Sequence, residues 1–255
     1  MSPLDGRSIV VTRPARQAGV LAGLIEAAGG RALRYPAIEI QAAAGPAVDA
    51  TIDALATFDL AIFISRNAVE YGLAYARAKR AWPAGLAVAT VGAGTRRALE
   101  AEGMADVIAP GGTADSEALL GEPRLKAVAG NRIVIFRGSG GRELLASTLR
   151  ARGATVEYAE CYRRVRPATD VEPLIGEWSR GAVHAVTVSS GEALANFAAL
   201  LGKAGHGFLA ATPLFVPHVR VGEEGRLLGL GPVQVAGPAD EEMLAALVAY
   251  FRRAG

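Results

Sequence analysis

Hydrophobic residues follow two alternating patterns along the chain. Short apolar runs, such as residues 9–11, 60–64 and 133–136, are typical of buried strands. Between these runs lie longer segments whose apolar residues recur three or four positions apart, as they do on one face of a helix. Short strands that alternate with amphipathic helices predict parallel α/β units. We therefore expect three-layer domains in which helices cover both faces of a parallel sheet.

The pattern repeats at an offset of about 124 residues, and such self-similarity indicates duplicated units. Residues 9–13 match residues 133–137, and the helical faces that follow keep the same spacing. Residues 60–65 match residues 184–189 at the same offset, after which the register drifts slightly, with residues 115–119 matching residues 240–244. The repeat predicts two similar domains with a cleft between them.

Two extended stretches, residues 35–41 and 156–164, interrupt this alternation at similar places in their repeats. Neither carries the apolar spacing of a helix face. We interpret them as the connections between the two domains.

Composition agrees with packed domains rather than with a disordered chain. Apolar residues make up 51% of the 255 residues and charged residues 20%. The net charge of +2, from 27 basic and 25 acidic residues, does not indicate a nucleic-acid partner. No apolar run approaches the length of a membrane span, and the N-terminus shows no signal-peptide core. Together with a single cysteine, Cys161, these features predict a cytoplasmic protein without disulfides.

Metal and nucleotide sites are not expected either. The histidines His184, His206 and His218 are scattered, without the Cys/His spacing of a metal site. Two glycine-rich loops approach a dinucleotide motif but carry Arg97 and Glu143 where the third glycine belongs. His184 lies inside an apolar strand and fits a core or edge histidine, whereas His218 follows a strand and stays a site candidate. We expect a protein without metal or cofactor.

Ligands of open α/β sheets bind beyond the carboxyl ends of the strands, so the loops after the strands carry the candidate residues. Each loop leads into an expected helix, whose first backbone N–H groups and dipole favour an anion. Guanidinium groups bind carboxylates and phosphates well. The candidate binding residues are Arg13, Ser65, Asn67, Thr95, Arg137, Gly138, Ser139, Arg142, Ser189, Ser190, Gly191 and Arg220.

Several of these residues also have a purely structural interpretation. Ser65, Thr95 and Ser190 are suited to cap the helices that they precede, and the glycines permit tight turns. Arg13 and Arg137 occupy equivalent places in the two repeats. Their symmetry fits either two ligand contacts or two structural anchors. Because both follow the first strand of a repeat, where we expect the cleft, we predict that they bind carboxylates.

A succession of motifs runs through nearly the whole chain, at residues 11–14, 36–40, 63–69, 91–95, 136–145, 160–164, 188–194 and 217–220. No single motif is specific by itself. In their order and spacing, however, they resemble the motifs of the uroporphyrinogen-III synthase family.

The resemblance implies two α/β domains joined by a two-stranded β connector. In that family the first domain is discontinuous, because the chain leaves it, builds the second domain and returns. Transferred to this sequence, one domain comprises residues 1–36 and 165–255, and the other comprises residues 42–160. The connectors are then residues 37–41 and 161–164.

The family closes hydroxymethylbilane, a linear tetrapyrrole, to uroporphyrinogen III in tetrapyrrole (haem-type) biosynthesis. Water is lost and ring D is inverted through a spiro intermediate, so the resemblance implies a carbon–oxygen lyase. The family uses neither metal nor cofactor, and its substrate carries several carboxylates that suit an arginine-lined cleft. We expect a monomer that makes transient contact with the enzyme producing its substrate. It should bind neither nucleic acid nor membrane.

Two other functions stay open at this point. A two-domain cytoplasmic protein that binds a small polyanion would have the same hinged architecture. An enzyme with a phosphate-bearing substrate would use the same loops, although the nucleotide motifs are missing.

Tyr162 matches the tyrosine that the family suggests as a donor to the departing hydroxyl group. A tyrosine at this place also fits a side chain that only covers the connection between the two domains. Thr95 matches a threonine of the family, but its counterpart in the second half is absent, since residues 218–221 are His-Val-Arg-Val. This departure leaves Arg220 as a candidate carboxylate contact.

Overall fold

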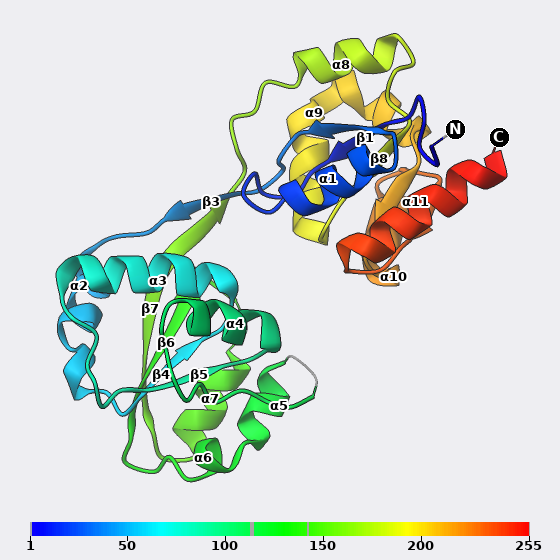
Figure 1. Ribbon diagram of the computed structural model, residues 1–255. Helices are drawn as coiled ribbons and strands as arrows, with labels where there is room; N and C mark the ends of the chain where they lie inside the picture. Colours follow the sequence, from blue (N-terminus) through cyan, green and yellow to red (C-terminus); the bar gives the residue numbers. More distant parts are fainter. Residues whose placement is uncertain (1, 113–114, 142, 255) are drawn as a thin grey trace. The chain divides into compact units, whose positions relative to one another are not determined.

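The computed structural model describes residues 2–112, 115–141 and 143–254. The chain divides into two compact units: unit 1 comprises Met1–Glu39 and Val165–Gly255, and unit 2 comprises Ile40–Arg164. Each unit holds a five-stranded sheet between helices (Figure 1). The expected α/β class, with two domains built on mainly parallel sheets, is therefore confirmed.

Parallel strands form the sheet of unit 1, in the order β10-β9-β8-β1-β2. The strands are β1 (Ser8–Val11), β2 (Arg31–Arg34), β8 (Ala185–Thr187), β9 (Leu214–Val216) and β10 (Val233–Val235). All residues of β1, β8 and β9 are buried. Central strands of a parallel sheet that is covered on both faces have this character, and it explains their continuous apolar runs.

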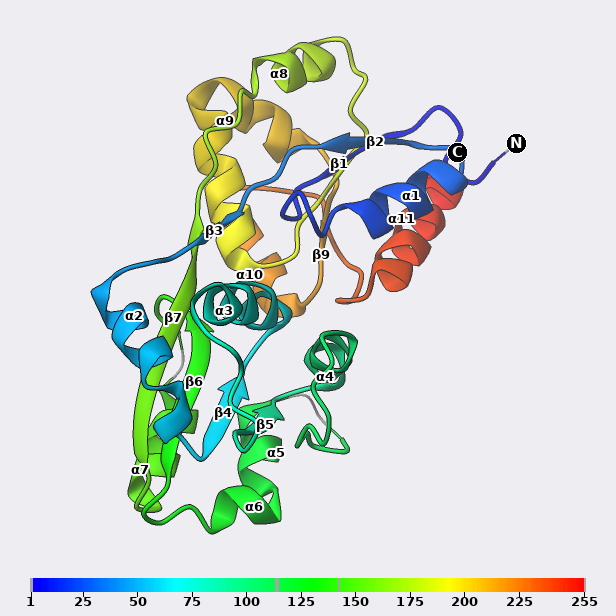
Figure 2. The ribbon, with the colours of Figure 1, turned by 60° about the vertical axis from the view of Figure 1, so that its left-hand side comes forward.

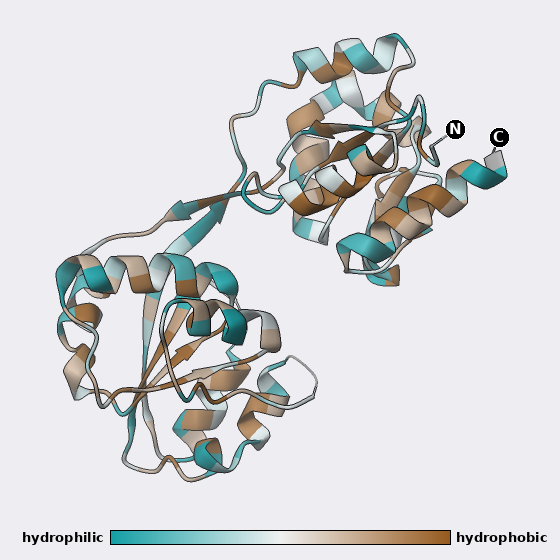
Figure 3. Ribbon diagram, in the orientation of Figure 1, coloured by the Kyte–Doolittle hydropathy of each residue, from teal (hydrophilic) through white to brown (hydrophobic). Residues whose placement is uncertain are grey.

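Helices cover both faces of this sheet. They are α1 (Gly19–Ala27) and α11 (Asp240–Ala254) on one face, and α8 (Glu172–Ser179), α9 (Gly191–Ala211) and α10 (Val219–Leu227) on the other (Figure 2). On the first face, Ile9 packs with Leu21, Ile25 and Leu247. Figure 3 shows the consequence: hydrophobic residues gather on the strands and on the helix faces turned toward them.

The sheet of unit 2 has the order β3-β7-β6-β4-β5, with parallel pairing from β7 to β5. Its strands are β3 (Glu39–Ala42), β4 (Leu60–Phe63), β5 (Ala87–Thr90), β6 (Arg132–Gly138) and β7 (Thr155–Val165). At the β3 edge, the Ala43 amide donates to the carbonyl oxygen of Cys161 at 3.0 Å. Beside β5, Ile108 forms an isolated parallel bridge with Ala89.

Alternate residues of β6 point into two separate cores. The helices of unit 2 are α2 (Pro46–Asp53), α3 (Arg66–Lys79), α4 (Ala93–Ala101), α5 (Ser116–Gly121), α6 (Pro123–Lys126) and α7 (Leu144–Ala151), with a 3₁₀ turn at Leu55–Thr57. Val134 and Phe136 pack with α2, α3 and α4. Ile133 and Ile135 pack with α5, α6 and α7. Two buried faces leave no polar position from Ile133 to Phe136, which explains the short apolar run.

The internal repeat is visible in the strand register, but the repeats and the units do not coincide. Ser8 pairs with Arg31 in unit 1, and Arg132 pairs with Thr155 in unit 2, with both partners shifted by 124 residues. The chain leaves unit 1 after β2 and returns to it with β8. Unit 1 thus combines the beginning of the first repeat with the end of the second. Strands β1, β2, β8 and β9 of unit 1 correspond to β6, β7, β4 and β5 of unit 2.

Candidate active site

Within each unit, the parallel strands end at one edge of the sheet, and the residues expected to bind a ligand lie at that edge. Unit 1 holds Arg13, Ser189, Ser190, Gly191 and Arg220, and unit 2 holds Ser65, Asn67, Thr95, Arg137, Gly138, Ser139 and Tyr162. Arg142 lies outside the described residues. The candidates therefore form two sets, one for each sheet.

Helices that follow equivalent strands begin in the same way in both units. After β4 and β8 a serine caps the helix: Ser65 Oγ accepts from the Ala68 amide at 3.0 Å, and Ser190 Oγ accepts from the Ala193 amide at 3.1 Å. For α1, α7, α4 and α10, which follow β1, β6, β5 and β9, the side chain of the N-cap residue makes no such hydrogen bond. First-turn N–H groups have no partner inside their helix. These four helix starts therefore offer backbone donors to an anion.

Ser65 and Ser190 are thus N-caps in this structure, as one of the two interpretations from the sequence had it. A contact of either serine with a ligand stays a prediction. Thr95 is not a cap, because Gly92 is the N-cap residue of α4 and Thr95 is buried in the first turn of that helix. Of the other polar candidates, Ser139 and Arg220 are exposed, and Asn67 and Ser189 are half-buried.

Two glycines of the site stand where the backbone passes close to a neighbouring side chain. A Cβ atom on Gly138 would lie 2.6 Å from the ring of Tyr162. A Cβ atom on Gly191 would lie 1.8 Å from a carboxylate oxygen of Glu224. The buried Tyr162 ring has no room to move, so packing requires glycine at position 138. The Glu224 carboxylate is the end of a flexible side chain and can turn away from a larger residue at position 191.

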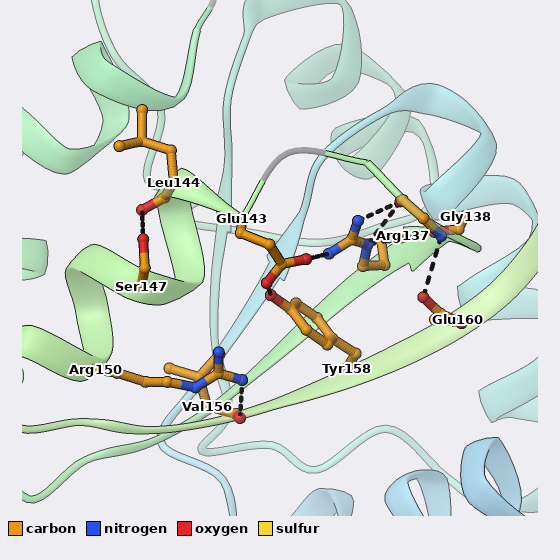
Figure 4. A network of polar contacts seen from close by, with 10 residues as sticks. Arg137, Gly138, Glu143, Leu144, Ser147, Arg150, Val156, Tyr158 and Glu160 are labelled. Carbon is orange, nitrogen blue, oxygen red and sulfur yellow. Dashed lines mark hydrogen bonds and ion pairs between the residues drawn. The ribbon is translucent and has the colours of Figure 1, made fainter.

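Arg137 ends the buried part of β6 and turns its side chain back onto its own loop. Only 3% of the residue is exposed. Its Nε donates to the carbonyl oxygens of Gly138 and Gly140 at 3.3 and 3.1 Å, and its Nη1 donates to Glu143 at 3.0 Å (Figure 4). The guanidinium carbon lies 4.5 Å from the centre of the Tyr158 ring. These contacts favour the structural interpretation of Arg137, and its binding of a ligand stays a prediction.

Arg13 has the equivalent position in unit 1 but a more open environment. Its side chain is 18% exposed and forms an ion pair with Asp240 at 2.7 Å. One Nη also donates to the carbonyl oxygen of Pro238 at 3.2 Å. Arg13 therefore has a partner and is still accessible to a second carboxylate.

Tyr162 is almost completely buried, with 2% of the residue exposed. Its hydroxyl oxygen lies 3.0 Å from Ser65 Oγ, the same atom that caps α3. Tyr162 also lines a cavity of about 100 Å³ together with Ile64, Arg164 and residues 138–141. The phenol is thus held at the carboxyl ends of β4 and β6, with its oxygen oriented by a hydroxyl group.

A β-bulge gives Tyr162 this orientation. Arg137 pairs with Glu160 but Gly138 pairs with Tyr162, so β7 has one extra residue at Cys161. Without the bulge, Tyr162 would share a face with Tyr158. Instead, Tyr158 packs on the α5–α7 side of the sheet and Tyr162 on the α2–α4 side.

A second cavity, of about 270 Å³, lies beside the end of β6. Its lining includes the guanidinium-bearing Arg137, the ring of Tyr158, and the apolar side chains of Ile64, Val91 and Leu145. It joins an apolar wall to a cation, as a pocket for part of an amphiphilic anion would. Tyr158, Glu143 and Val91 are not among the residues predicted from the sequence. Tyr158 lies within β7 rather than at its end, and an acidic or apolar side chain in a loop gives no signal of anion binding.

Cys161 and His184 carry no features of reactive groups. Burial raises the pKa of the Cys161 thiol to about 12, so the nucleophilic thiolate is disfavoured. His184 Nδ1 accepts from the Ser8 amide at 3.0 Å, and burial lowers the pKa of its imidazole. His218 is exposed at the start of α10.

Among residues 2–112, 115–141 and 143–254, no group of three or more His, Cys, Asp and Glu side chains is placed to hold a metal ion. Within the same residues, no helix combines the length and the apolar character that crossing a membrane requires.

Comparison with known proteins assigns the family. The model of the family described as uroporphyrinogen-III synthase HemD matches residues 19–246. The chain belongs to the uroporphyrinogen-III synthase family. The resemblance inferred from its motifs is thereby confirmed.

Relatives with this activity in their names match the chain over almost its full length. Uroporphyrinogen-III synthase of Salmonella typhimurium is 35% identical over 242 residues, which cover 93% of this chain and 98% of the relative. The Escherichia coli protein of the same name is 32% identical over 240 residues, with the same shares covered.

Solved structures of family members share the fold. The structure of a mutant uroporphyrinogen III synthase from Thermus thermophilus matches with a TM-score of 0.62 and 18% identity, covering 97% of this chain and 99% of that one. Uroporphyrinogen-III synthetase from Helicobacter pylori matches with a TM-score of 0.63 and 14% identity, covering 96% and 99%. At these identities the match supports the two-domain α/β architecture.

Proposed function

We propose that this chain is an enzyme that forms uroporphyrinogen III by closing hydroxymethylbilane, with loss of water and inversion of ring D. The match to relatives of that name over 93% of the chain is the observation that supports this most. The four helix starts without side-chain caps add support, because they offer donors to the several carboxylates of such a substrate. A reaction that eliminates water from a C–O bond makes the enzyme a carbon–oxygen lyase.

Orientation of the substrate is the main task in this reaction. Loss of hydroxide gives an electron-deficient azafulvene, which must be attacked by the substituted carbon of ring D to give the spiro intermediate. Attack by the unsubstituted carbon would close the ring without inversion. A folded substrate that presents the correct carbon favours the first course, and effective concentrations in such oriented reactions are large.

We assign the roles of the residues as follows. Tyr162 donates a hydrogen bond to the departing hydroxyl, and Ser65 orients the phenol through the 3.0 Å contact between their oxygens. Arg13 and Arg220 bind substrate carboxylates, because both side chains are accessible. Arg137 shapes the loop that follows β6. The remaining candidates serve as further substrate contacts: Asn67, Thr95, Gly138 and Ser139 at the strand ends of unit 2, and Ser189, Ser190 and Gly191 at those of unit 1. Arg142, which lies outside the described residues, stays a candidate contact from the sequence.

Cofactor use, oligomeric state, partner enzyme and cellular location are part of the same proposal. The enzyme works without metal or cofactor, as a monomer. A substrate that loses its hydroxyl group readily favours a transient contact with the enzyme that produces it. A lone cysteine that is buried and unpaired suits the reducing cytoplasm.

The decisive experiment incubates the purified protein with freshly made hydroxymethylbilane and separates the product isomers. We expect uroporphyrinogen III, with unchanged activity after treatment with a chelator. Reactions without protein or with heat-unfolded protein are the controls, and they should give the isomer without inversion. A protein that binds the linear tetrapyrrole but gives no more type III isomer than the controls would be a binding protein for polyanions.

A further inference from the structure

The loop that follows β6 is fixed from inside by one guanidinium group. Arg137 Nε and Nη2 donate to the carbonyl oxygen of Gly140, Nε also donates to that of Gly138, and Nη1 donates to Glu143. Gly141 adopts a φ of 117° and passes so close that a Cβ atom would lie 2.8 Å from Nη2. The Gly140 amide donates to Glu160 at 3.3 Å. The turn is thus wrapped around a cation that is almost completely buried.

Two residues that the proposed reaction does not use hold this cation in place. Glu143 accepts from Arg137 with one carboxylate oxygen and from the Tyr158 hydroxyl with the other (Figure 4). The ring of Tyr158 lies under the Arg137 guanidinium, and the guanidinium carbon of Arg150 lies 5.4 Å from the same ring. Glu143 is the N-cap residue of α7, but its side chain does not cap the helix. It therefore connects the end of β6, the start of α7 and the middle of β7.

We propose that Glu143 and Tyr158 are positioning residues for substrate binding: through Arg137 they keep residues 138–141 and the start of α7 in the shape that accepts a substrate carboxylate. This inference rests on the proposed function and names the part of the chain that one carboxylate arm contacts. A carboxylate arm is remote from the carbon that reacts. Its binding contributes equally to the ground state and the transition state, so its loss raises KM and leaves kcat unchanged.

A different role for Glu143 would be to occupy Arg137 until a substrate carboxylate displaces it. The geometry argues against that role. Arg137 has all three nitrogen atoms in use within its own loop and is only 3% exposed, whereas the Glu143 side chain is 61% exposed. A displaced Glu143 would free Nη1 alone, because Nε and Nη2 would still donate to the carbonyl oxygens of Gly138 and Gly140.

The test is the variant Tyr158→Phe, which keeps the ring beneath Arg137 and removes the hydroxyl group that holds Glu143. We expect KM for hydroxymethylbilane to rise about 5- to 10-fold, the scale of one ordinary hydrogen bond, with kcat within about twofold. Tyr75→Phe is the matched control, because Tyr75 also donates to a carboxylate, Asp49, at 2.6 Å in the same unit. Its kinetics should match those of the unchanged protein.

A second measurement reports the loop without any substrate. Exchange of the Gly140 amide hydrogen should accelerate about 5-fold or more in Tyr158→Phe and Glu143→Gln, and stay unchanged in Tyr75→Phe. The proposal is wrong if Tyr158→Phe leaves both this exchange and KM as they are in Tyr75→Phe, or if Glu143→Gln lowers KM. An unchanged protein that makes no uroporphyrinogen III would refute the proposed function instead, and the exchange rates would still decide whether the two residues hold the loop.

Discussion

Arg13 and Arg137 hold the same place in the two repeats, yet their ionic partners lie at different places. Arg13 pairs with Asp240 at the start of α11. By the repeat, Asp240 corresponds to Asp115 at the start of α5, but Asp115 caps its own helix through the Ala118 amide at 2.7 Å. Arg137 instead pairs with Glu143 from its own loop, and the corresponding position in unit 1 is Gly19. The duplicated backbone places both arginines, whereas the acidic residues nearby decide what each arginine does.

The exchange of partners has a functional consequence. Arg13 keeps part of its guanidinium accessible at the strand ends of unit 1, whereas Arg137 has become an internal support of unit 2. We therefore expect the two units to divide the work: unit 1 contributes cationic side chains to the substrate, and unit 2 contributes a shaped backbone and the Tyr162 phenol. Substitutions in each unit test that division.

Tyr162→Phe should have the largest effect. Unit 1 has no equivalent phenol, since the residue 124 positions earlier is Ile38. Loss of a donor to the leaving hydroxyl should reduce kcat for uroporphyrinogen III about 10- to 1000-fold, the scale of general-acid catalysis. The fold should survive because the ring over Gly138 remains. Steady-state kinetics with isomer analysis provides the measurement.

Tyr71→Phe serves as the control for that variant. The Tyr71 ring lies 6.0 Å from the Tyr162 ring, and its hydroxyl donates to the carbonyl oxygen of Ile40 at 3.0 Å. The Tyr71→Phe variant therefore removes a phenol hydroxyl group near Tyr162 and leaves the proposed donor itself in place. Near-normal turnover in Tyr162→Phe would make Tyr162 a cover for the connection, and substrate folding alone would carry the catalysis.

The arginine pair should differ most in stability. Arg137→Ala should lower the free energy of unfolding by about 3 kcal/mol, because it breaks a buried hydrogen-bonded ion pair and empties its space. It should also raise KM, because residues 138–141 lose the guanidinium that holds them. Arg13→Ala should lower the free energy of unfolding by less than about 1 kcal/mol, since its ion pair is partly exposed, but should raise KM about 10-fold. Urea unfolding and steady-state kinetics measure both quantities. Equal losses of stability in the two variants would show that Arg13 and Arg137 have the same structural role.

The sequence predicts the backbone of this site better than the orientation of its side chains. Continuous apolar runs arise because β1 and β6 are buried on both faces, so the strands and their equivalence could be predicted. The face on which Tyr162 lies could not, because it depends on the bulge between Arg137 and Gly138. A bulge leaves no mark in the hydrophobic pattern of β7.

Glu143 and Tyr158 show a second limit of the sequence. They are distant along the chain and have no shared spacing, and only the packing of β7 beside the loop brings the hydroxyl to the carboxylate. The sequence did place Arg137 at the strand end. Whether its guanidinium faces a ligand or its own loop depends on neighbours such as Glu143 and Tyr158. The hydrophobic pattern of the sequence does not identify these neighbours.

The serine caps allow the two units to be compared at another equivalent position. Ser65→Ala and Ser190→Ala should each lower the free energy of unfolding by about 1 kcal/mol, because each removes one N-cap hydrogen bond. Only Ser65 also contacts the Tyr162 hydroxyl. Ser65→Ala should therefore reduce kcat several-fold, on the scale of one hydrogen bond, while Ser190→Ala should leave kcat unchanged. Similar kinetics in both variants would remove Ser65 from the orientation of Tyr162.

A comparison that needs no substrate uses Cys161, the single thiol of the chain, in the core of unit 2. Its raised pKa of about 12 leaves only about one thiol in ten thousand as thiolate at pH 8. The folded protein should therefore react with a thiol reagent only when unit 2 opens. Arg137→Ala should accelerate labelling about 100-fold, in proportion to its loss of stability, whereas Arg13→Ala should leave the rate unchanged because it weakens unit 1. Labelling in urea-unfolded protein gives the upper limit, and acceleration in Arg13→Ala in proportion to its own loss of stability would mean that the two units open together.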